Sequence, residues 1–473
     1  MPAWREISLW MSQLDEALQP RPQFTGAHEA DIAIIGAGYT GLWTAYYLKT
    51  AAPSLKIIIL EAETAGFGAS GRNGGWLMGA MLGEGRLLGH LPEPQRRIGW
   101  DLLHDIPDEV ARVLAAENID CDYRKGGTLH CAARYPEQER RLRAELAQLY
   151  QEGLNEEDYR WLTPAELSTQ LRIPGAMGAI YTPHCATIHP AKLVRGLASA
   201  VERLGVQIFE QSAVTGWAPR QVSTALGSVR AEWVVPAMEG YAVSVPPFGR
   251  YQLPVQSMLV ATEPLPDSVW DEIGLSNGQS FSENSRQVTY GQRTADNRLA
   301  FGARGGYRFG GRPRADFTLT EAETSLRRNL FTALLPQLRN VEITHRWGGN
   351  LGMSRRFQPH MLIDRRNAIA LSGGYGGEGV GASNLGGRTL AHLILGQDTV
   401  ETRQSWVIHD RTPQEALRSW EPEPLRWLGF KAIIQSFARE DEVLADPNTA
   451  SWRRHLAERV ADAMEKLMTW PIG

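Results

Sequence analysis

The chain has 473 residues, of which 43% are hydrophobic and 22% are charged, as in a globular protein with two or three domains or one large domain carrying an insertion. A net charge of −4 offers no basic field for a nucleic acid and no polybasic segment for a membrane surface. Three scattered cysteines predict neither a disulfide framework nor a metal site. No run of about 18 apolar residues could span a bilayer, and residues 1–10 lack the features of a secretory signal, so a cytoplasmic location is expected.

The first clear pattern is a β-strand, a glycine-rich turn, a helix and a second β-strand, in that order. The turn at residues 36–41 reads GAGYTG and matches G-x-G-x-x-G. Gly36 permits the tight turn, Gly38 lets the backbone approach a pyrophosphate, and Gly41 allows the helix to pack closely on the strand. Glu61 ends the second strand and can accept hydrogen bonds from the ribose hydroxyls of an adenosine. The order predicts a dinucleotide site, whereas the glycines alone would also suit a tight turn without a ligand.

An acidic residue after the second strand disfavours the 2′-phosphate of NADP and leaves NAD and FAD as alternatives. A second glycine-dense segment, GFGASGRNGGW at residues 66–76, could cover more phosphate and reach a flavin ring. Within it, Ser70 and Asn73 are candidate donors to phosphate oxygens, and Arg72 could add positive charge. The alternative is an ordinary glycine-rich surface loop.

Further along the chain, helical spacing predicts helices within residues 86–118 and 136–152, and strands dominate residues 250–310. Residues 287–304 predict a β-hairpin whose turn is Asp296-Asn297. Two helices are expected in the tail, at about residues 429–445 and 450–469. No internal repeat interrupts this order.

The segment GASGRNGG at residues 68–75 resembles the N-terminal signature of the FAD-dependent D-amino-acid oxidase/glycine oxidase superfamily. It is most similar to the branch that contains gamma-glutamylputrescine oxidoreductase and related secondary-amine oxidases. The resemblance continues in residues 188–197, 231–241, 346–352 and 368–383, and covers roughly residues 30–400. It favours FAD over NAD.

The resemblance implies an α/β (α+β) fold: a Rossmann-like FAD-binding domain with an inserted substrate domain built on an antiparallel sheet. The FAD-binding domain is expected to comprise residues 1–85, 160–250 and 340–400. The substrate domain is expected to comprise residues 86–159 and 251–339. Residues 401–473 form a helical C-terminal tail, which either packs on the substrate domain or forms a homodimer contact.

The resemblance also implies which residues hold FAD, with Val214 against the adenine and residues 374–380 against the flavin ring. Relatives with covalent flavin attach it through a late cysteine or an early histidine; no cysteine follows Cys185, so non-covalent FAD is expected. The family often has histidine where Glu378 stands, and we expect Glu378 to face solvent or pair with an arginine. The residues expected to contact FAD are Gly36, Gly38, Tyr39, Thr40, Gly41, Glu61, Ala62, Ala69, Ser70, Arg72, Asn73, Gly74, Gly75, Trp76, Val214, Gly240, Gly374, Tyr375, Gly376, Gly377, Glu378, Gly379 and Val380.

Flavin-dependent amine oxidation moves a hydride from the C–H beside a neutral amine to the flavin, and the imine then hydrolyses. The protein mainly positions and desolvates the amine, so no strict acid or base is required. The candidate residues for the substrate site are Tyr290, Arg304, Trp347, Arg356 and Tyr375. Trp347 and Tyr375 would equally suit the core; either arginine could bind a carboxylate or phosphonate, or form a surface ion pair. His184 and His189 are expected to cap or pack.

The expected partners are a small-molecule amine and an electron acceptor, either O2 or another molecule. Several amine oxidases of the superfamily use a lysine over the flavin to activate O2, but no lysine occurs between Lys192 and Lys431. A quinone- or carrier-linked dehydrogenase is therefore an alternative, as is a flavin-binding non-oxidase subunit or a tRNA-modifying flavoprotein. The arginines of residues 304–314 favour an anionic amine, although the abundance of arginine could also reflect a GC-rich genome.

Overall fold

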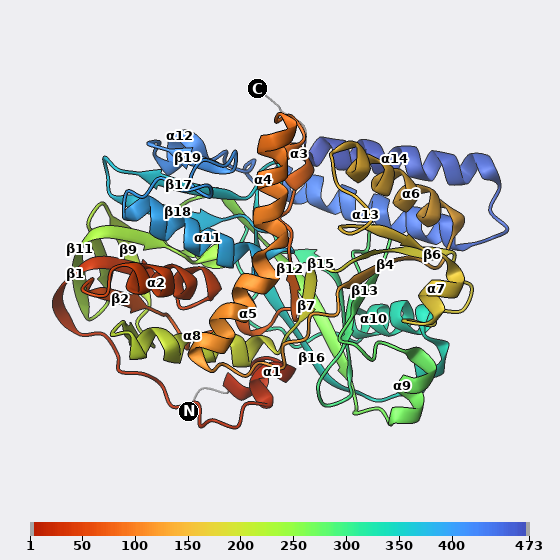
Figure 1. Ribbon diagram of the computed structural model, residues 1–473, viewed down its shortest axis with the longest axis horizontal. Coiled ribbons are helices and arrows are strands. Elements are labelled where there is room, and N and C mark those ends of the chain that lie inside the picture. Colours follow the sequence, from red (N-terminus) through yellow and green to blue (C-terminus); the bar gives the residue numbers. More distant parts are fainter. Residues whose placement is uncertain (1–3, 470–473) are drawn as a thin grey trace.

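The computed structural model describes residues 4–469 and contains two large β-sheets with helices packed on their faces (Figure 1). Residues 1–3 and 470–473, at the ends of the predicted FAD-binding domain and of the predicted tail, lie outside the described residues. The mixed α/β architecture with a helical C-terminal region confirms the predicted fold class. None of the helices in the described part of the chain combines the length and apolarity that a membrane crossing needs.

The nine-stranded sheet has the order β19-β17-β18-β11-β1-β2-β8, with β10 pairing to β11 and β9 to β10. The pairs β1/β2, β1/β11, β2/β8 and β11/β18 are parallel, because α2 and α8 provide the crossovers that parallel strands need. Its elements are β1 (Gly26–Ile35), α2 (Tyr39–Ala51), β2 (Ile57–Leu60), α8 (Pro190–Arg203), β8 (Gln207–Phe209), β9 (Val214–Ala218), β10 (Gln221–Thr224), β11 (Gly227–Pro236), β17 (His360–Asp364), β18 (Ile369–Gly373), α11 (Gly379–Ile394) and β19 (Val407–His409).

The eight-stranded sheet has the order β16-β12-β15-β14-β13-β4-β6-β5 and is antiparallel except between β13 and β4. Its strands are β4 (Thr128–Ala132), β5 (Arg160–Leu162), β6 (Gly178–Thr182), β12 (Gln252–Thr262), β13 (Ser280–Glu283), β14 (Tyr290–Arg293), β15 (Leu299–Tyr307) and β16 (Ile343–Ser354). The predicted hairpin is confirmed, since β14 and β15 pair around a turn in which Asn297 has φ +63°.

The two faces of this sheet differ in chemistry. On one face Phe281 and Phe301 pack with Phe331 of α10 (Glu321–Leu334) in an apolar core that also includes α9 (Asp267–Ile273). The other face carries Ser257, Tyr290 and Arg304, because cross-strand partners in a sheet share a face. The polar face therefore lies opposite α9 and α10, and Phe437 of the C-terminal region packs against its Arg304.

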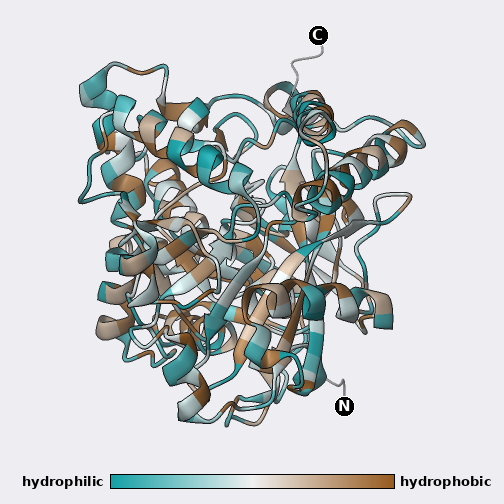
Figure 2. Cartoon of the chain, turned by 90° about the vertical axis from the view of Figure 1, so that its right-hand side faces the viewer, coloured by the Kyte–Doolittle hydropathy of each residue, from teal (hydrophilic) through white to brown (hydrophobic). Residues whose placement is uncertain are grey.

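The remaining elements lie outside the two large sheets. A two-stranded ribbon pairs β3 with β7. In Figure 2, brown and teal residues both occur around the helices, as expected where one face of each helix is buried. These elements are η1 (Trp4–Ile7), α1 (Leu9–Ser12), η2 (Ala69–Gly71), β3 (Trp76–Met78), α3 (Glu84–Leu88), α4 (Glu93–His104), α5 (Ile106–Glu117), α6 (Pro136–Gln151), α7 (Pro164–Ser168), β7 (Cys185–Thr187), η3 (Glu239–Ser244), η4 (Pro336–Leu338) and α12 (Pro413–Ala416).

Strand pairing and packing shift four of the predicted domain boundaries. Strands β5 and β6, within the predicted FAD-binding range 160–250, belong to the eight-stranded sheet because β6 pairs with β4. Strand β16, predicted in 340–400, pairs with β12 along its length. Helices α4 and α5, predicted in 86–159, share the core of α2 and α11, and β19 of the predicted tail joins the nine-stranded sheet.

The C-terminal helices α13 (Leu425–Ala445) and α14 (Ser451–Thr469) pack beside α6 and the eight-stranded sheet, at the blue end of the chain in Figure 1. Arg134 pairs with Asp441, and Arg454 pairs with Glu137 at 2.6 Å. The tail therefore packs on elements within the range predicted for the substrate domain; that domain and a homodimer contact stay predictions.

Candidate functional site

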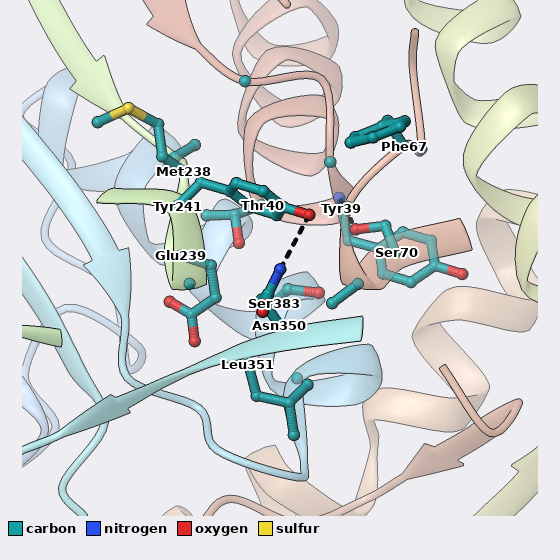
Figure 3. A pocket seen from close by; sticks show the side chains of 18 of the residues that line it. Tyr39, Thr40, Phe67, Ser70, Met238, Glu239, Tyr241, Asn350, Leu351 and Ser383 are labelled. Carbon is teal, nitrogen blue, oxygen red and sulfur yellow. Dashed lines mark hydrogen bonds between the residues drawn. The ribbon is translucent and has the colours of Figure 1, made fainter. Parts of the chain in front are cut away.

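A cavity of about 410 Å³ is lined by segments far apart in the sequence, among them those of Thr40 and Ser383 (Figure 3). Gly38 and Gly376 line the same cavity. It runs along the glycine-rich turn before α2, the segment before α11, and β16. Most residues predicted to contact FAD line it: Gly36, Gly38, Tyr39, Thr40, Glu61, Ala62, Ala69, Ser70, Asn73, Val214, Gly240, Tyr375, Gly376, Gly377, Gly379 and Val380.

The turn between β1 and α2 presents main-chain groups to the cavity. Gly36 has φ +104°, and a side chain there would meet the carbonyl oxygen of Ala237 at 2.8 Å. A side chain on Gly41 would collide with the carbonyl oxygen of Gly36, so Gly41 packs α2 on β1 as predicted. The backbone N–H of Tyr39 donates to Ser70 Oγ at 2.9 Å, which leaves the hydroxyl proton of Ser70 available to another acceptor.

Glu61 lies at the end of β2 and its carboxylate reaches back toward the turn. It accepts hydrogen bonds from the backbone N–H groups of Ala37 (2.8 Å) and Glu63 (3.0 Å). Burial raises the pKa of Glu61 to about 7, although both hydrogen bonds favour the ionised form. A carboxylate with remaining lone pairs at the cavity wall is suited to accept from sugar hydroxyls.

Glu239 was not predicted as a site residue, yet it lines the cavity and holds the opposite wall in place. Its carboxylate accepts hydrogen bonds from the backbone N–H groups of Gly374 and Tyr375, both at 3.1 Å. A side chain on Gly352 would meet this carboxyl group at 2.7 Å, so glycine is needed there. Burial raises the pKa of Glu239 to about 7. The only signal in the sequence for a special role of Glu239 is that residues 238–239 depart from the family pattern that residues 231–241 otherwise resemble.

Other lining residues that were not predicted come from the glycine-rich loop, from η3 and the residue before it, from β16 and from α11. Figure 3 shows Asn350 Nδ2 donating to the hydroxyl of Tyr241 at 3.2 Å, across the cavity. The unpredicted residues labelled there are Phe67, Met238, Glu239, Tyr241, Asn350, Leu351 and Ser383.

Seven residues predicted to contact FAD lie outside the cavity lining: Gly41, Arg72, Gly74, Gly75, Trp76, Gly374 and Glu378. Arg72 is buried, donates to the carbonyl oxygens of Phe67 (2.7 Å) and Gly348 (3.4 Å), and stacks on Phe317. It therefore stabilises the second glycine-rich loop from behind. The ring of Tyr290 and the amide of Gln292 would leave no room for a side chain on Gly74 or Gly75, which rest on the eight-stranded sheet.

The expectation for Glu378 was wrong. The residue is half-buried at the start of α11, and no ion pair to an arginine is found for it within residues 4–469. Burial raises the pKa of Glu378, and its neighbours include another buried acid, Glu84, whose pKa rises to about 8. Burial thus opposes ionisation of both carboxyl groups.

Of the five predicted substrate-site residues, only Tyr375 lines the cavity; Trp347 belongs to the core, and Tyr290, Arg304 and Arg356 lie outside the lining. Trp347 is 1% exposed, donates to the carbonyl oxygen of Arg72 at 2.8 Å and packs edge-on against Trp10, so it belongs to the core. Tyr375 lines the cavity with its ring, but its hydroxyl donates to Ser372 (2.7 Å) and accepts from Thr40 (3.3 Å).

Tyr290 and Arg304 lie on the polar face of the eight-stranded sheet. The hydroxyl of Tyr290 hydrogen-bonds to Ser257, and its ring lies 6.3 Å from that of Trp76 in an edge-on arrangement. Arg304 stacks over Phe437 of α13 at 5.2 Å, and no carboxylate of the described residues forms an ion pair with it. Burial lowers the pKa of Arg304 to about 10.

Arg356 lies in the turn between β16 and β17, with φ +73°. Its carbonyl oxygen accepts from Arg86 at 2.7 Å, and it does not line the cavity. His189 caps α8, accepting from the backbone N–H of Lys192 at 3.1 Å, as expected. His184 instead stacks on another histidine, His104.

Comparisons with known proteins agree with this geometry. The family model described as FAD dependent oxidoreductase matches residues 31–393. The chain is 31% identical over 390 residues to a probable oxidoreductase OrdL of Haemophilus influenzae, covering 80% of this chain and 85% of that protein. It is 29% identical over 378 residues to gamma-glutamylputrescine oxidoreductase of Escherichia coli, covering 77% and 84%.

A similar fold is found in a glycine oxidase from Bacillus cereus, with a TM-score of 0.64 and 21% identity over 78% of this chain and 96% of that one. The family match ends before residue 401, so α13 and α14 lie outside it.

Proposed function

The chain belongs to the family of FAD-dependent oxidoreductases, and from this premise we propose that it oxidises a primary or secondary amine to an imine. The observation that carries the proposal is the cavity shared by Gly38 and Gly376, with main-chain amides on both walls. The hydrolysed imine would give an aldehyde or a keto acid. The similarity to gamma-glutamylputrescine oxidoreductase and to glycine oxidase supports an amine as substrate.

The lining of the cavity fits FAD. Glycines at positions 36, 38, 376, 377 and 379 leave the backbone accessible at both ends, and a side chain on Gly377 would project into open space. We assign the pyrophosphate to the N-terminus of α2 with Ser70, and the ribose to Glu61. No cysteine or histidine is among the described lining residues, which supports non-covalent binding.

The chemistry that FAD supplies when bound is acceptance of a hydride from the C–H beside the amine nitrogen. Gly379 and Val380, at the N-terminus of α11, line the cavity, so the positive end of the helix dipole points toward that part of it. Tyr290 and Ser257 offer hydroxyl groups on the polar sheet face, where they would orient the amine. Desolvation of the amine on binding would favour its neutral form.

Arg304 supports an anionic amine as substrate. Arg304 is half-buried and forms no ion pair within the described residues, and a substrate carboxylate would supply an acceptor for its guanidinium. Its cross-strand partner Ser257 places it on the same sheet face as Tyr290. We therefore assign Arg304, rather than Arg356, to the substrate.

Two candidates remain for the electron acceptor, O2 and a quinone or carrier protein. No lysine, arginine or histidine lines the cavity among the described residues, so the lining offers no side-chain cation for activating O2. This favours a quinone or carrier protein as an alternative acceptor. Rapid mixing of the reduced enzyme with O2 or with an artificial acceptor would distinguish the two.

The test begins with the visible spectrum of the purified full-length protein, which should show bound FAD. Anaerobic addition of gamma-glutamylputrescine, glycine and an uncharged amine should bleach that spectrum for at least one of them. Bound FAD that no amine reduces would overturn amine oxidation and favour a flavin-binding subunit without oxidase activity.

A further inference from the structure

Helix α14, at the outer edge of the molecule in Figure 1, exposes a row of large apolar side chains. Helices α13 and α14 carry six of the thirteen large hydrophobic residues that are exposed within the described chain. Four of the six belong to α14: Trp452, Leu456, Val460 and Leu467. At about 100° of rotation per residue, these four fall within an arc of about 80°. They form one stripe, whereas exposed apolar residues that need no explanation are scattered singly.

The opposite side of α14 packs on the protein. Ala461, about half a turn around the helix from the stripe, is buried in one cluster with Ile433 and Phe437 of α13. Arg454, on the same side as Ala461, pairs with Glu137 of α6 at 2.6 Å. The stripe therefore points away from the protein, and its four side chains are left in solvent.

Ion pairs hold the acidic residues of α14 toward the protein. Glu458 pairs with Arg141 of α6 at 2.9 Å. Asp462 and Glu465 both pair with Arg286 of the eight-stranded-sheet region. Every carboxylate of this helix therefore has an arginine of another element as its partner.

The residues that border the stripe are basic. Arg453 lies beside one edge, and Arg459, Lys466 and His455 lie along the other, all with exposed side chains. Arg453 and Arg459 form no ion pair within residues 4–469. Acidic and basic residues alternate along the helix, so the sequence shows no polybasic segment, and only the fold collects the bases around the apolar stripe.

This arrangement is complementary to an anionic lipid surface. A helix with an apolar face of Trp and Leu and with basic borders lies in the plane of a membrane interface, with the apolar face at the acyl boundary. Its basic side chains extend to the headgroup phosphates. A second copy of the chain is a less favourable occupant, because a symmetric pairing of two stripes would bring the basic borders of both copies together.

We propose that α14 docks the protein on an anionic membrane surface, with the stripe in the interface and Arg453 and Arg459 at the lipid phosphates. The family match ends at residue 393, so docking would belong to the C-terminal region of this chain. A quinone, one of the two candidate electron acceptors, dissolves in such a bilayer, and docking would bring the enzyme to it. The docking surface itself depends on neither the acceptor nor the amine.

The test measures cosedimentation of the full-length protein, with its cofactor, with lipid vesicles. Vesicles of equal parts phosphatidylcholine and phosphatidylglycerol should bind the wild type at least about tenfold more strongly than vesicles of phosphatidylcholine alone, and added salt should release it. Leu456→Gln and Arg459→Gln should each weaken binding to the anionic vesicles by about fivefold or more, because each removes one half of the complementarity.

Two matched controls lie far from α14 in the sequence. Leu226→Gln changes a leucine in the turn between β10 and β11 that is 53% exposed, as is Leu456. Arg230→Gln removes an exposed arginine of β11 that forms no ion pair within the described residues. Neither control should change vesicle binding. All four variants should keep the Tm and the bound FAD of the wild type, so that weaker binding is not a sign of misfolding.

The wild type alone can overturn the proposal, whatever the variants do. Equal binding to the two kinds of vesicle would remove the anionic surface as the occupant. Unchanged binding of Leu456→Gln would remove the stripe from the contact. A dimer in sedimentation velocity that Leu456→Gln converts to a monomer would assign the stripe to a second copy of the chain instead.

Discussion

Oε1 of Glu239, at the start of η3 after β11, accepts a hydrogen bond of 3.1 Å from the backbone N–H of Tyr375, in the loop after β18. Oε2 accepts from Gly374 in the same manner, and Gly352 leaves room for the carboxyl group. Glu239 itself has φ +45°, a conformation that residues with side chains rarely adopt. The carboxyl group therefore fixes the loop that precedes α11, and its protonation should affect the stability of the fold.

Glu239→Gln should reduce the pH dependence of stability of the apoprotein. The pKa of Glu239 is raised from 4.5 to about 7, so its contribution is fully present below pH 4.5 and is lost as the pH rises through about 7. Glutamine does not titrate, so up to about 3 kcal/mol of this loss should disappear. Urea unfolding between pH 4.5 and 7 measures the free energy of unfolding of both proteins and so its dependence on pH.

The control is Glu272→Gln, which changes an exposed side chain on α9 and should leave the pH profile unaltered. Glu61 and Glu84 also have raised pKa values, so part of the pH dependence of stability should remain in Glu239→Gln. The interpretation fails if Glu239→Gln and the wild type lose stability equally between pH 4.5 and 7.

Gly41→Ala should destabilise the protein by about 1–3 kcal/mol and weaken FAD binding, because the added methyl group would collide with the carbonyl oxygen of Gly36. Gly429→Ala is the matched control: it lies exposed in α13 with nothing near its added methyl group. It should stabilise the protein by about 0.5–1 kcal/mol. Unfolding free energies and FAD titrations measure both effects; a destabilisation of the same size in both variants would contradict the packing argument.

Local sequence was sufficient to predict the β1–α2–β2 unit, because Gly41 and Glu61 contact Gly36 and Ala37 of the same unit. The role of Trp347 was not predictable in this way. Whether that side chain enters the core or the site depends on which face of β16 it occupies, and thus on the register with β12. A periodic pattern within one strand does not reveal its partner.

The same reason explains Glu239 and the shifted domain boundaries. Glu239 is recognisable as a brace only once the loop at Gly374 lies beside it. Helices α4 and α5 show a plain helical period, but that period does not indicate that Leu103 and Val110 pack in the core of α2 and α11. Long-range contacts, rather than local propensity, decide these features.

Arg304→Gln should raise the KM for an amine that carries a carboxylate by about tenfold to a hundredfold, because a charged hydrogen bond contributes about 1.5–3 kcal/mol. The KM for an uncharged amine and the affinity for FAD should change little. Steady-state kinetics with the two substrates measures the difference. Arg403→Gln, which removes an exposed arginine paired with Asp398, is the control. An equal rise for both substrates would remove Arg304 from carboxylate recognition.

Arg286→Leu should loosen the C-terminal helices from the eight-stranded sheet. Arg286 contacts Glu440 at 2.8 Å and also pairs with Asp462 and Glu465. The Glu440 side chain is only 1% exposed, so removing a partner leaves a buried carboxylate with Arg141 alone, at a cost of about 3 kcal/mol. Urea unfolding and limited proteolysis of the segment before α13 measure the effect.

The matched control is Arg439→Leu on α13, the helix that also carries Glu440. Arg439 pairs with Glu442 at 2.9 Å, but the two side chains are 64% and 66% exposed, so the change should cost less than about 1 kcal/mol. The two variants differ in burial and in the number of partners, because Arg286 pairs with three carboxylates and Arg439 with one. Equal stability and equal proteolysis of the two variants would show that the ion pairs of Arg286 do not hold the tail on the eight-stranded sheet. The position of Arg304 beside Phe437 would then need another explanation.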